Sequence, residues 1–87
     1  GAGPAPYNPE IHLENSVLTK DNEPSSRRLG YDPVNQEIII FDWDSSYLDG
    51  AVEIPNYHGH ARPLNKDAKL PPEHLKRFCE KFKRYFR

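Results

Sequence analysis

Residues 27–44 have the sequence RRLGYDPVNQEIIIFDWD, which predicts a β-hairpin and decides the fold. Asp32 and Pro33 favour the start of a turn, and Asn35 tolerates a left-handed backbone conformation. The β-branched and aromatic residues that follow the turn favour a strand. We therefore expect two antiparallel strands, one on each side of residues 32–36.

Side chains of the second strand alternate between the two faces of the sheet. One face is apolar, and the other changes from apolar to acidic toward the end of the strand. The first face holds Ile39, Phe41 and Trp43, and the second holds Ile38, Ile40, Asp42 and Asp44.

The chain after this hairpin is expected to contain a loop and a further strand. Residues 45–50 are predicted as a loop, and residues 51–54 as a brief apolar stretch. Pro55 ends that stretch or confines it to a sheet edge, because proline has no amide hydrogen for the ladder. A further strand is predicted over residues 56–62.

The last part of the chain predicts an amphipathic helix after a connection at residues 63–72. Prolines 71 and 72 suit a helix entry, and Glu73 favours the first turn. Apolar residues then recur at steps of three and four, namely Leu75, Phe78, Cys79, Phe82, Tyr85 and Phe86. The expected fold is α+β: an antiparallel sheet of three to four strands packed on one C-terminal amphipathic helix. Within the apolar stripe, Cys79 is expected to be an inert buried thiol.

The 87 residues suffice for one small domain. Residues 1–9 are rich in proline and predict a linker or an added remnant, which leaves residues 10–87 as a single domain. Between residues 10 and 26, one short strand or helical turn is expected. No apolar run exceeds four residues, which excludes a membrane span, and a single cysteine excludes an internal disulfide.

The net charge of −1 hides a division along the chain. Residues 73–87 carry six basic and two acidic side chains, a net charge of +4, whereas residues 1–72 carry six basic and eleven acidic side chains, a net charge of −5. Such a division predicts either a basic surface for a polyanion or pairing between the two parts of the chain.

The segment Tyr57-His58-Gly59-His60-Ala61-Arg62 carries the strongest functional signal. On an extended backbone His58, His60 and Arg62 project to one side. An imidazole exchanges a proton near neutral pH, and a guanidinium binds a phosphate. Cleavage of RNA by its own 2′ hydroxyl needs a base, an acid and positive charge at the phosphate, and no metal.

Three other interpretations of these residues stay open. In the first interpretation, the histidines are solvated residues of an edge strand. In the second, they bind a divalent metal together with Asp42 and Asp44. In the third, the two aspartates pair with Arg27, Arg28 or Arg62 across the sheet, which is compatible with catalysis.

Further candidates surround this segment. Phosphate contacts are expected from Arg27 and Arg28 before the hairpin and from Lys66 and Lys69 after the histidines. His12 and His74 are expected to be surface residues.

The motifs YDPVNQEIIIFD at residues 31–42 and YHGHARPL at residues 57–64 resemble the carboxy-terminal nuclease domains of bacterial polymorphic toxins, including contact-dependent inhibition toxins. The resemblance covers about residues 29–64. It implies a small RNase whose sheet is similar to that of barnase, colicins or RelE. It departs from the barnase-like pattern in its late helix and in the insertion at residues 44–55.

The resemblance implies that His58, His60 and Arg62 form the active site of an endoribonuclease, with Asp42 orienting a histidine. It also implies delivery from a producing bacterium into the cytoplasm of a target cell, and a cognate immunity protein that blocks the site. No cofactor is expected.

Two other functions remain open. The chain is a non-catalytic protein-binding module if Phe82, Tyr85 and Phe86 form an exposed anchor. It is the inhibitor of such a toxin if its acidic part is the functional surface.

Overall fold

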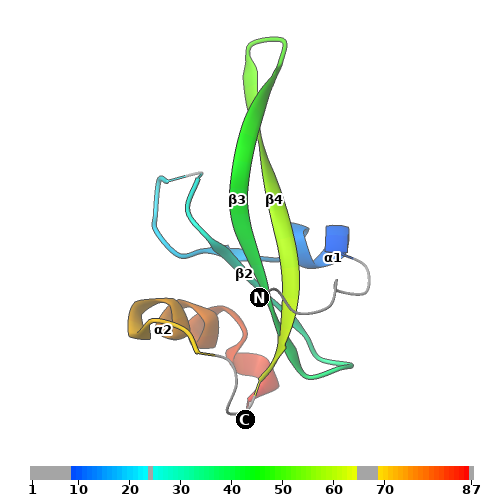
Figure 1. Ribbon diagram of the computed structural model, residues 1–87. Helices are drawn as coiled ribbons and strands as arrows, with labels where there is room; N and C mark the ends of the chain where they lie inside the picture. Colours follow the sequence, from blue (N-terminus) through cyan, green and yellow to red (C-terminus); the bar gives the residue numbers. More distant parts are fainter. Residues whose placement is uncertain (1–8, 24, 65–68, 87) are drawn as a thin grey trace.

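The computed structural model describes residues 9–23, 25–64 and 69–86, which form an α+β fold (Figure 1). Its four-stranded antiparallel sheet has the order β1-β2-β3-β4, so β4 is an edge strand, as Pro55 predicts. Two helices pack on the sheet. The elements are α1 (Pro9–Glu14), β1 (Val17–Leu18), β2 (Arg28–Asp32), β3 (Glu37–Asp49), β4 (Val52–Pro63), α2 (Pro72–Lys81) and the 3-10 helix η1 (Lys83–Tyr85).

The amino-terminal part is more structured than its sequence predicts. Both α1 and β1 form where one short strand or helical turn was expected, and α1 begins at Pro9, the last residue of the predicted linker. Residues 1–8 lie outside the described residues. Gly30 allows α1 to approach β2, because a Cβ atom at this position would lie 3.0 Å from the carbonyl oxygen of His12.

The predicted turn between β2 and β3 forms around the side chain of Asp32. One carboxylate oxygen accepts hydrogen bonds from the backbone amides of Val34 and Asn35 at 3.0 and 3.2 Å, and the other accepts one from Asn35 Nδ2 at 2.8 Å. The left-handed residue is Gln36, with φ of 53°, rather than Asn35. The Asp32 side chain therefore fixes the turn, and the left-handed position falls one residue later.

The prediction of a loop at residues 45–50 is wrong. Strand β3 continues to Asp49, and β4 begins at Val52 and passes through Pro55 without ending. Both strands gain ladder hydrogen bonds from each other, which outweighs the turn preference of Asp, Ser and Pro. The turn itself is at Gly50, whose φ of 64° suits glycine. We call residues 43–57, the part of this hairpin beyond the end of β2, the arm (Figure 1).

Apolar side chains are buried on both faces of the sheet. The face toward α2 holds the larger cluster, in which Phe78 of the helix packs on Ile38 and Ile40. The opposite face, toward α1, buries Ile39 and Phe41. The larger cluster consists of Leu29, Tyr31, Ile38, Ile40, Phe78 and Phe82, and the smaller one of Ile39, Phe41 and Ala61.

Helix α2 is shorter than its apolar pattern predicts, and it buries a narrower stripe. It ends at Lys81, and of its residues Phe78 is buried. Phe82 follows at the next turn and is also buried, whereas Leu75, Tyr85 and Phe86 are about 40% exposed. Cys79 is exposed, so the prediction of a buried thiol is wrong. It follows Phe78 by one residue, and a step of about 100° turns it away from the sheet.

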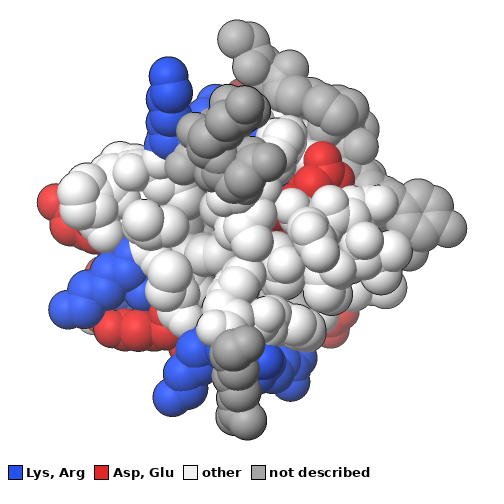
Figure 2. Space-filling view, turned by 90° about the horizontal axis from the view of Figure 1, so that it is seen from below, with Lys and Arg blue, Asp and Glu red and all other residues white. Residues whose placement is uncertain are grey.

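Part of the charge division is resolved by pairing within the chain. Arg77 of α2 donates two hydrogen bonds to the carboxylate of Asp21, at 2.6 and 2.9 Å, which joins the helix to the segment between β1 and β2. These hydrogen bonds lower the pKa of Asp21. On the face in Figure 2, groups of basic and acidic side chains alternate around a neutral centre. The basic helix therefore does not form a continuous basic field on that face.

No helix in the described part of the chain has the length and apolar character needed to cross a membrane. Cys79, the only cysteine of the sequence, is a free thiol and forms no disulfide.

Candidate functional site

The predicted histidine strand lies within β4, and its pairing with β3 fixes where each side chain projects. His58 pairs with Asp42, His60 with Ile40, and Arg62 with Ile38. Directly paired residues of antiparallel strands share a face. Because Ile38 and Ile40 pack beneath α2, all three predicted site residues project to the α2 side of the sheet.

The two histidines differ sharply in exposure. The side chain of His58 is 77% exposed, and its Nε2 atom lies 3.2 Å from a carboxylate oxygen of Asp44. His60, two residues further toward the helix, is only 9% exposed. One imidazole is therefore open to solvent and paired with a carboxylate, while the other is covered by the protein.

Burial determines the protonation state of His60. It lowers the pKa of this imidazole; the nearby Asp42 opposes the shift, and Arg62 and Arg27 add to it. The Nε2 atom is buried without a hydrogen-bond partner. His60 is therefore neutral at pH 7, since its ordinary pKa of 6.5 already lies below that pH.

His74 is a site residue that was expected to be a surface residue. It lies in the first turn of α2, four residues before Phe78, and therefore faces the sheet. Burial lowers its pKa, and the charge of Arg27 contributes. Its Nδ1 atom is buried without a partner. The spacing of His74, Phe78 and Phe82 is the sequence signal that indicates this burial.

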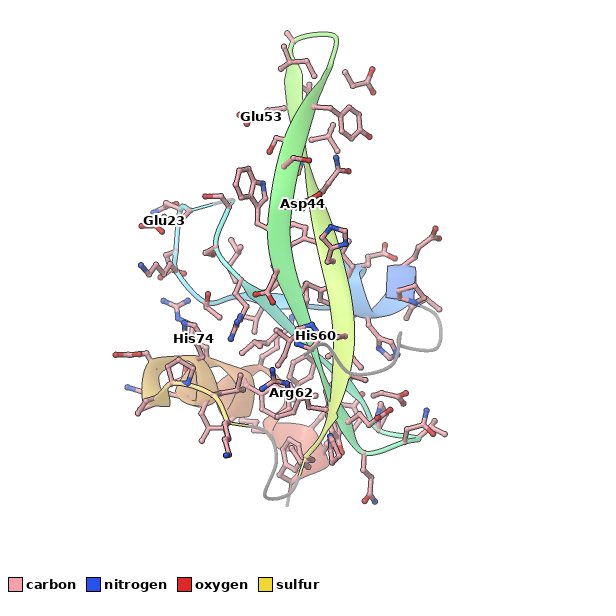
Figure 3. All side chains as sticks on the ribbon, in the orientation of Figure 1. Glu23, Asp44, Glu53, His60, Arg62 and His74 are labelled. Carbon is pink, nitrogen blue, oxygen red and sulfur yellow. The ribbon has the colours of Figure 1, made fainter. Side chains whose placement is uncertain are left out.

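Arg27 links the two covered histidines. Its Nε atom donates a hydrogen bond of 2.7 Å to Asp42, and its charge acts on both His60 and His74. Figure 3 shows His60 and Arg62 on the lower part of β4, with His74 on the neighbouring helix. The site thus contains one open imidazole, two covered imidazoles and two guanidinium groups.

Asp42 makes its described hydrogen bond with an arginine and not with a histidine. The resemblance implies that it orients a histidine, but its described hydrogen bond is with Arg27, and Asp44 pairs with His58 instead. A bulge between Trp43 and Ser45 explains the change, because it alters the register of β3 directly beside Asp44.

The structure describes two of the other three predicted phosphate contacts, Arg28 and Lys69. Arg28 pairs with Phe41, so it projects to the α1 side, where its guanidinium donates hydrogen bonds to Ser16 at 2.7 and 3.2 Å. Lys69 is exposed in the connection before α2, and Lys66 lies outside the described residues. Of the three predicted phosphate contacts that the structure describes, Arg27 is the one whose charge acts on the histidines.

His12 is part of a different surface. Its Nε2 atom lies 3.9 Å from a carboxylate oxygen of Asp32. It lines a cavity of about 350 Å³ between α1 and the end of the chain, together with Tyr31, Lys81 and Arg84. The three site residues predicted on β4 do not line this cavity.

The four residues predicted as metal ligands do not form a metal-binding site. Among the described residues, no group of three or more His, Cys, Asp or Glu side chains is placed to hold a metal ion. Asp42 is bound to Arg27, and Asp44 to His58. The ligand set of the two histidines and two aspartates therefore does not come together in this arrangement.

No protein-family model matches the chain, and no curated protein or solved structure is significantly similar to it. What the site can do is therefore argued from its own chemistry: an open imidazole beside a carboxylate can donate a proton, a covered neutral imidazole can accept one, and the guanidinium groups can bind a phosphate.

Proposed function

We propose that this chain is the nuclease domain of a bacterial polymorphic toxin, and that it cleaves RNA without a metal ion. The toxin would be delivered from the producing bacterium into the cytoplasm of a target cell, as in contact-dependent inhibition. An immunity protein would block the site in the producer. The observation that carries the proposal is the projection of His58, His60 and Arg62 from one face of β4.

The proposed reaction uses the 2′ hydroxyl of the substrate as the nucleophile. The 2′ oxygen attacks the adjacent phosphorus as a base removes its proton, and the bond from phosphorus to the 5′ oxygen breaks as an acid protonates that oxygen. The products are a 2′,3′-cyclic phosphate and a 5′ hydroxyl. The protein needs only two proton-transfer groups and positive charge at the phosphate.

We assign the acid to His58 and the base to His60. The Asp44 carboxylate lies 3.2 Å from Nε2 of His58, so the proton for the leaving 5′ oxygen would come from Nδ1 of this exposed ring. His60 has a lowered pKa, so its ring is neutral and able to accept a proton. Because its Nε2 atom is covered, the transfer falls to its Nδ1 atom.

We assign binding of the substrate phosphate to Arg62 and Arg27. Arg62 is two residues from His60 on the same face of β4, and Arg27 lies beside Asp42, the partner of His58 in the sheet. A guanidinium group remains charged at any physiological pH and binds phosphate oxygens in pairs. Negative charge that develops on the phosphate in the transition state would be stabilised there.

The first experiment compares RNA cleavage by the wild-type chain with that by His58→Ala and His60→Gln in the presence of EDTA. Each variant is expected to lower the rate at least about a hundredfold, the scale for loss of a general acid or base. Circular dichroism of each variant separates loss of chemistry from loss of fold. Undiminished cleavage in two folded variants would remove the mechanism, and loss of cleavage on chelation would favour a metal-dependent nuclease.

A non-catalytic protein-binding module is the second candidate function, and the exposed apolar side chains of the arm favour it. Trp43, Tyr47, Leu48 and Val52 are between 41% and 73% exposed. Expression in bacteria separates the two candidates, because an RNase without its inhibitor is toxic and a docking module is not. Growth that His58→Ala restores would support the nuclease.

A further inference from the structure

The arm has an unpaired strand edge. Strand β2 pairs with β3 only from Glu37 to Phe41, whereas β3 continues to Asp49. Within the described residues, no strand pairs with the outer edge of β3 beyond Phe41. Figure 1 shows this part of the hairpin projecting away from the two helices. The backbone N–H and C=O groups on that edge are available to another strand.

The exposed side chains of the arm are unusually apolar for a segment with no cover. Leu48 is 73% exposed, Val52 59%, Tyr47 52% and Trp43 41%. Isolated apolar residues on a surface are ordinary, but here each face of one short hairpin carries two, Trp43 and Leu48 on one face and Tyr47 and Val52 on the other. Trp43 and Tyr47 also belong to the residue types that are enriched at protein interfaces.

A hollow runs beside one face of the arm. It has a volume of about 460 Å³ and is lined by Trp43, Ser46, Glu53 and Pro55, with Ser25 on its other side. Ser46 pairs with Pro55 and Leu48 with Glu53, so both pairs share the Trp43 face. The face next to the open edge therefore offers an aromatic wall, an exposed leucine and a carboxylate.

The charge of the arm has one sign. No Lys or Arg occurs between residues 29 and 61, whereas Asp44, Asp49 and Glu53 all lie on the arm. The arm would therefore repel nucleic acid and any acidic surface. A second copy of the arm carries the same charges, which disfavours pairing of two identical edges.

We propose that the arm is a docking site for a partner protein that adds a basic β-strand to the outer edge of β3. The partner strand alternates apolar residues with Lys or Arg: its apolar side chains cover Trp43 and Leu48 on one face of the arm, and its cations meet Asp49 on the other face. Backbone hydrogen bonds supply affinity in this mode of recognition, and the side chains supply specificity. The inference does not depend on RNA cleavage.

Trp43 is the only tryptophan of the chain and lies on the proposed contact face, so its fluorescence reports docking directly. The probe is a short synthetic peptide that alternates lysine and valine, added to the full chain at low salt. We expect a saturable blue shift of the emission that weakens as salt is raised. A peptide that alternates glutamate and valine should give no shift.

A second peptide tests backbone pairing. It has the same sequence as the basic peptide, but alternate amides are N-methylated, which removes the donors of one edge. Its affinity should be at least about tenfold lower, because several backbone hydrogen bonds are lost. Equal affinity of the methylated and unmethylated peptides would overturn strand addition.

Variants of the arm locate the contact. Asp49→Lys and Leu48→Lys should each lower the affinity of the basic peptide about tenfold or more, while Lys69→Glu, on the exposed connection before α2, should not lower it. Absence of any fluorescence change with the basic peptide would refute the proposal. A concentration-dependent dimer in sedimentation, abolished by Leu48→Lys, would assign the edge to a second copy instead.

Discussion

The lower part of the β3–β4 hairpin and the arm are built from the same two strands but differ in what covers them. Ile38, Ile39 and Ile40 are fully buried, with α2 on one face and α1 on the other. Beyond Phe41 the strands continue without either helix, and Leu48 is 73% exposed. The proposed catalytic residues lie where the covered part becomes the uncovered part, with His60 buried and His58 exposed.

This difference indicates that ladder hydrogen bonds contribute most to the arm, together with a side-chain hydrogen bond from Trp43 to Ser46, whereas side-chain burial stabilises the lower part. Burial of apolar area contributes about 25 cal/mol per Å². The stability of the chain should therefore depend strongly on the lower residues and weakly on those of the arm.

The largest expected effect is loss of a core isoleucine. Ile40→Ala should lower the free energy of unfolding by about 2–5 kcal/mol, because it removes a fully buried side chain between β3 and α2. The matched change Leu48→Ala on the arm should cost no more than about 0.5 kcal/mol. Urea denaturation of both variants measures the comparison, and equal losses would contradict it.

The two glycines Gly30 and Gly50 give a second comparison, with a smaller effect. Gly30→Ala should destabilise the chain by about 1–3 kcal/mol, because the new Cβ atom meets a backbone carbonyl of α1 at 3.0 Å. Gly50→Ala has open space around it but a φ of 64°, so it should cost about 1–2 kcal/mol.

The proposed reasons for these two costs are separable. Gly50→Asn should recover much of the loss at the arm turn, because asparagine tolerates a left-handed conformation. Gly30→Asn should not recover any loss at β2. Thermal unfolding of the four variants checks this, and recovery at both positions would show that crowding at Gly30 is unimportant.

The stability should depend on pH through the two covered histidines. The pKa of His60 and that of His74 are both lowered from 6.5, so the folded chain binds fewer protons than the unfolded chain. Stability should therefore be greatest above pH 6.5 and fall as the pH decreases toward the lower, folded-state pKa values.

Urea midpoints between pH 8 and pH 5 measure this dependence. The double variant His60→Gln and His74→Gln should flatten the curve in this range, and His58→Gln serves as the exposed control. A wild-type curve that is flat across the range would contradict the burial of the two imidazoles.

The smallest effect is expected at Cys79. Because the thiol is exposed, a thiol reagent should label the native chain as rapidly as the urea-unfolded chain, within about a factor of ten. Cys79→Ser should change the free energy of unfolding by no more than about 0.5 kcal/mol. Protection of the thiol in the native chain would show that α2 packs with a different face toward the sheet.

The sequence predicts the covered part of the fold well, because there local pattern and burial agree. The run of β-branched residues before Phe41 forms a strand, and Asp32 forms the turn before it. In the arm, the pattern Asp-Ser-Ser resembles a loop, and only the pairing partner shows that it is a strand. Single-strand patterns carry no information about that partner.

The sequence predicts which residues of the candidate site share a face of β4, but not how deeply each side chain is buried. Alternation correctly places His58, His60 and Arg62 together, since the period of a strand is two. Whether a residue of that face is covered depends on where α2 ends over the sheet, which is set by the packing of Phe78 and Phe82 on Ile38 and Ile40. This long-range packing also half-buries His74, covering its Nδ1 atom, and leaves His58 open.

The most direct test of the proposed nuclease is incubation of the purified chain with two oligonucleotides of one sequence, in EDTA. One is RNA, and the other is the same strand with 2′-deoxyribose throughout. We predict that the RNA is cut to fragments with 2′,3′-cyclic phosphate ends and that the deoxy strand stays intact. An intact RNA, or equal cleavage of both strands, would contradict a reaction that His58 and His60 drive through the 2′ hydroxyl.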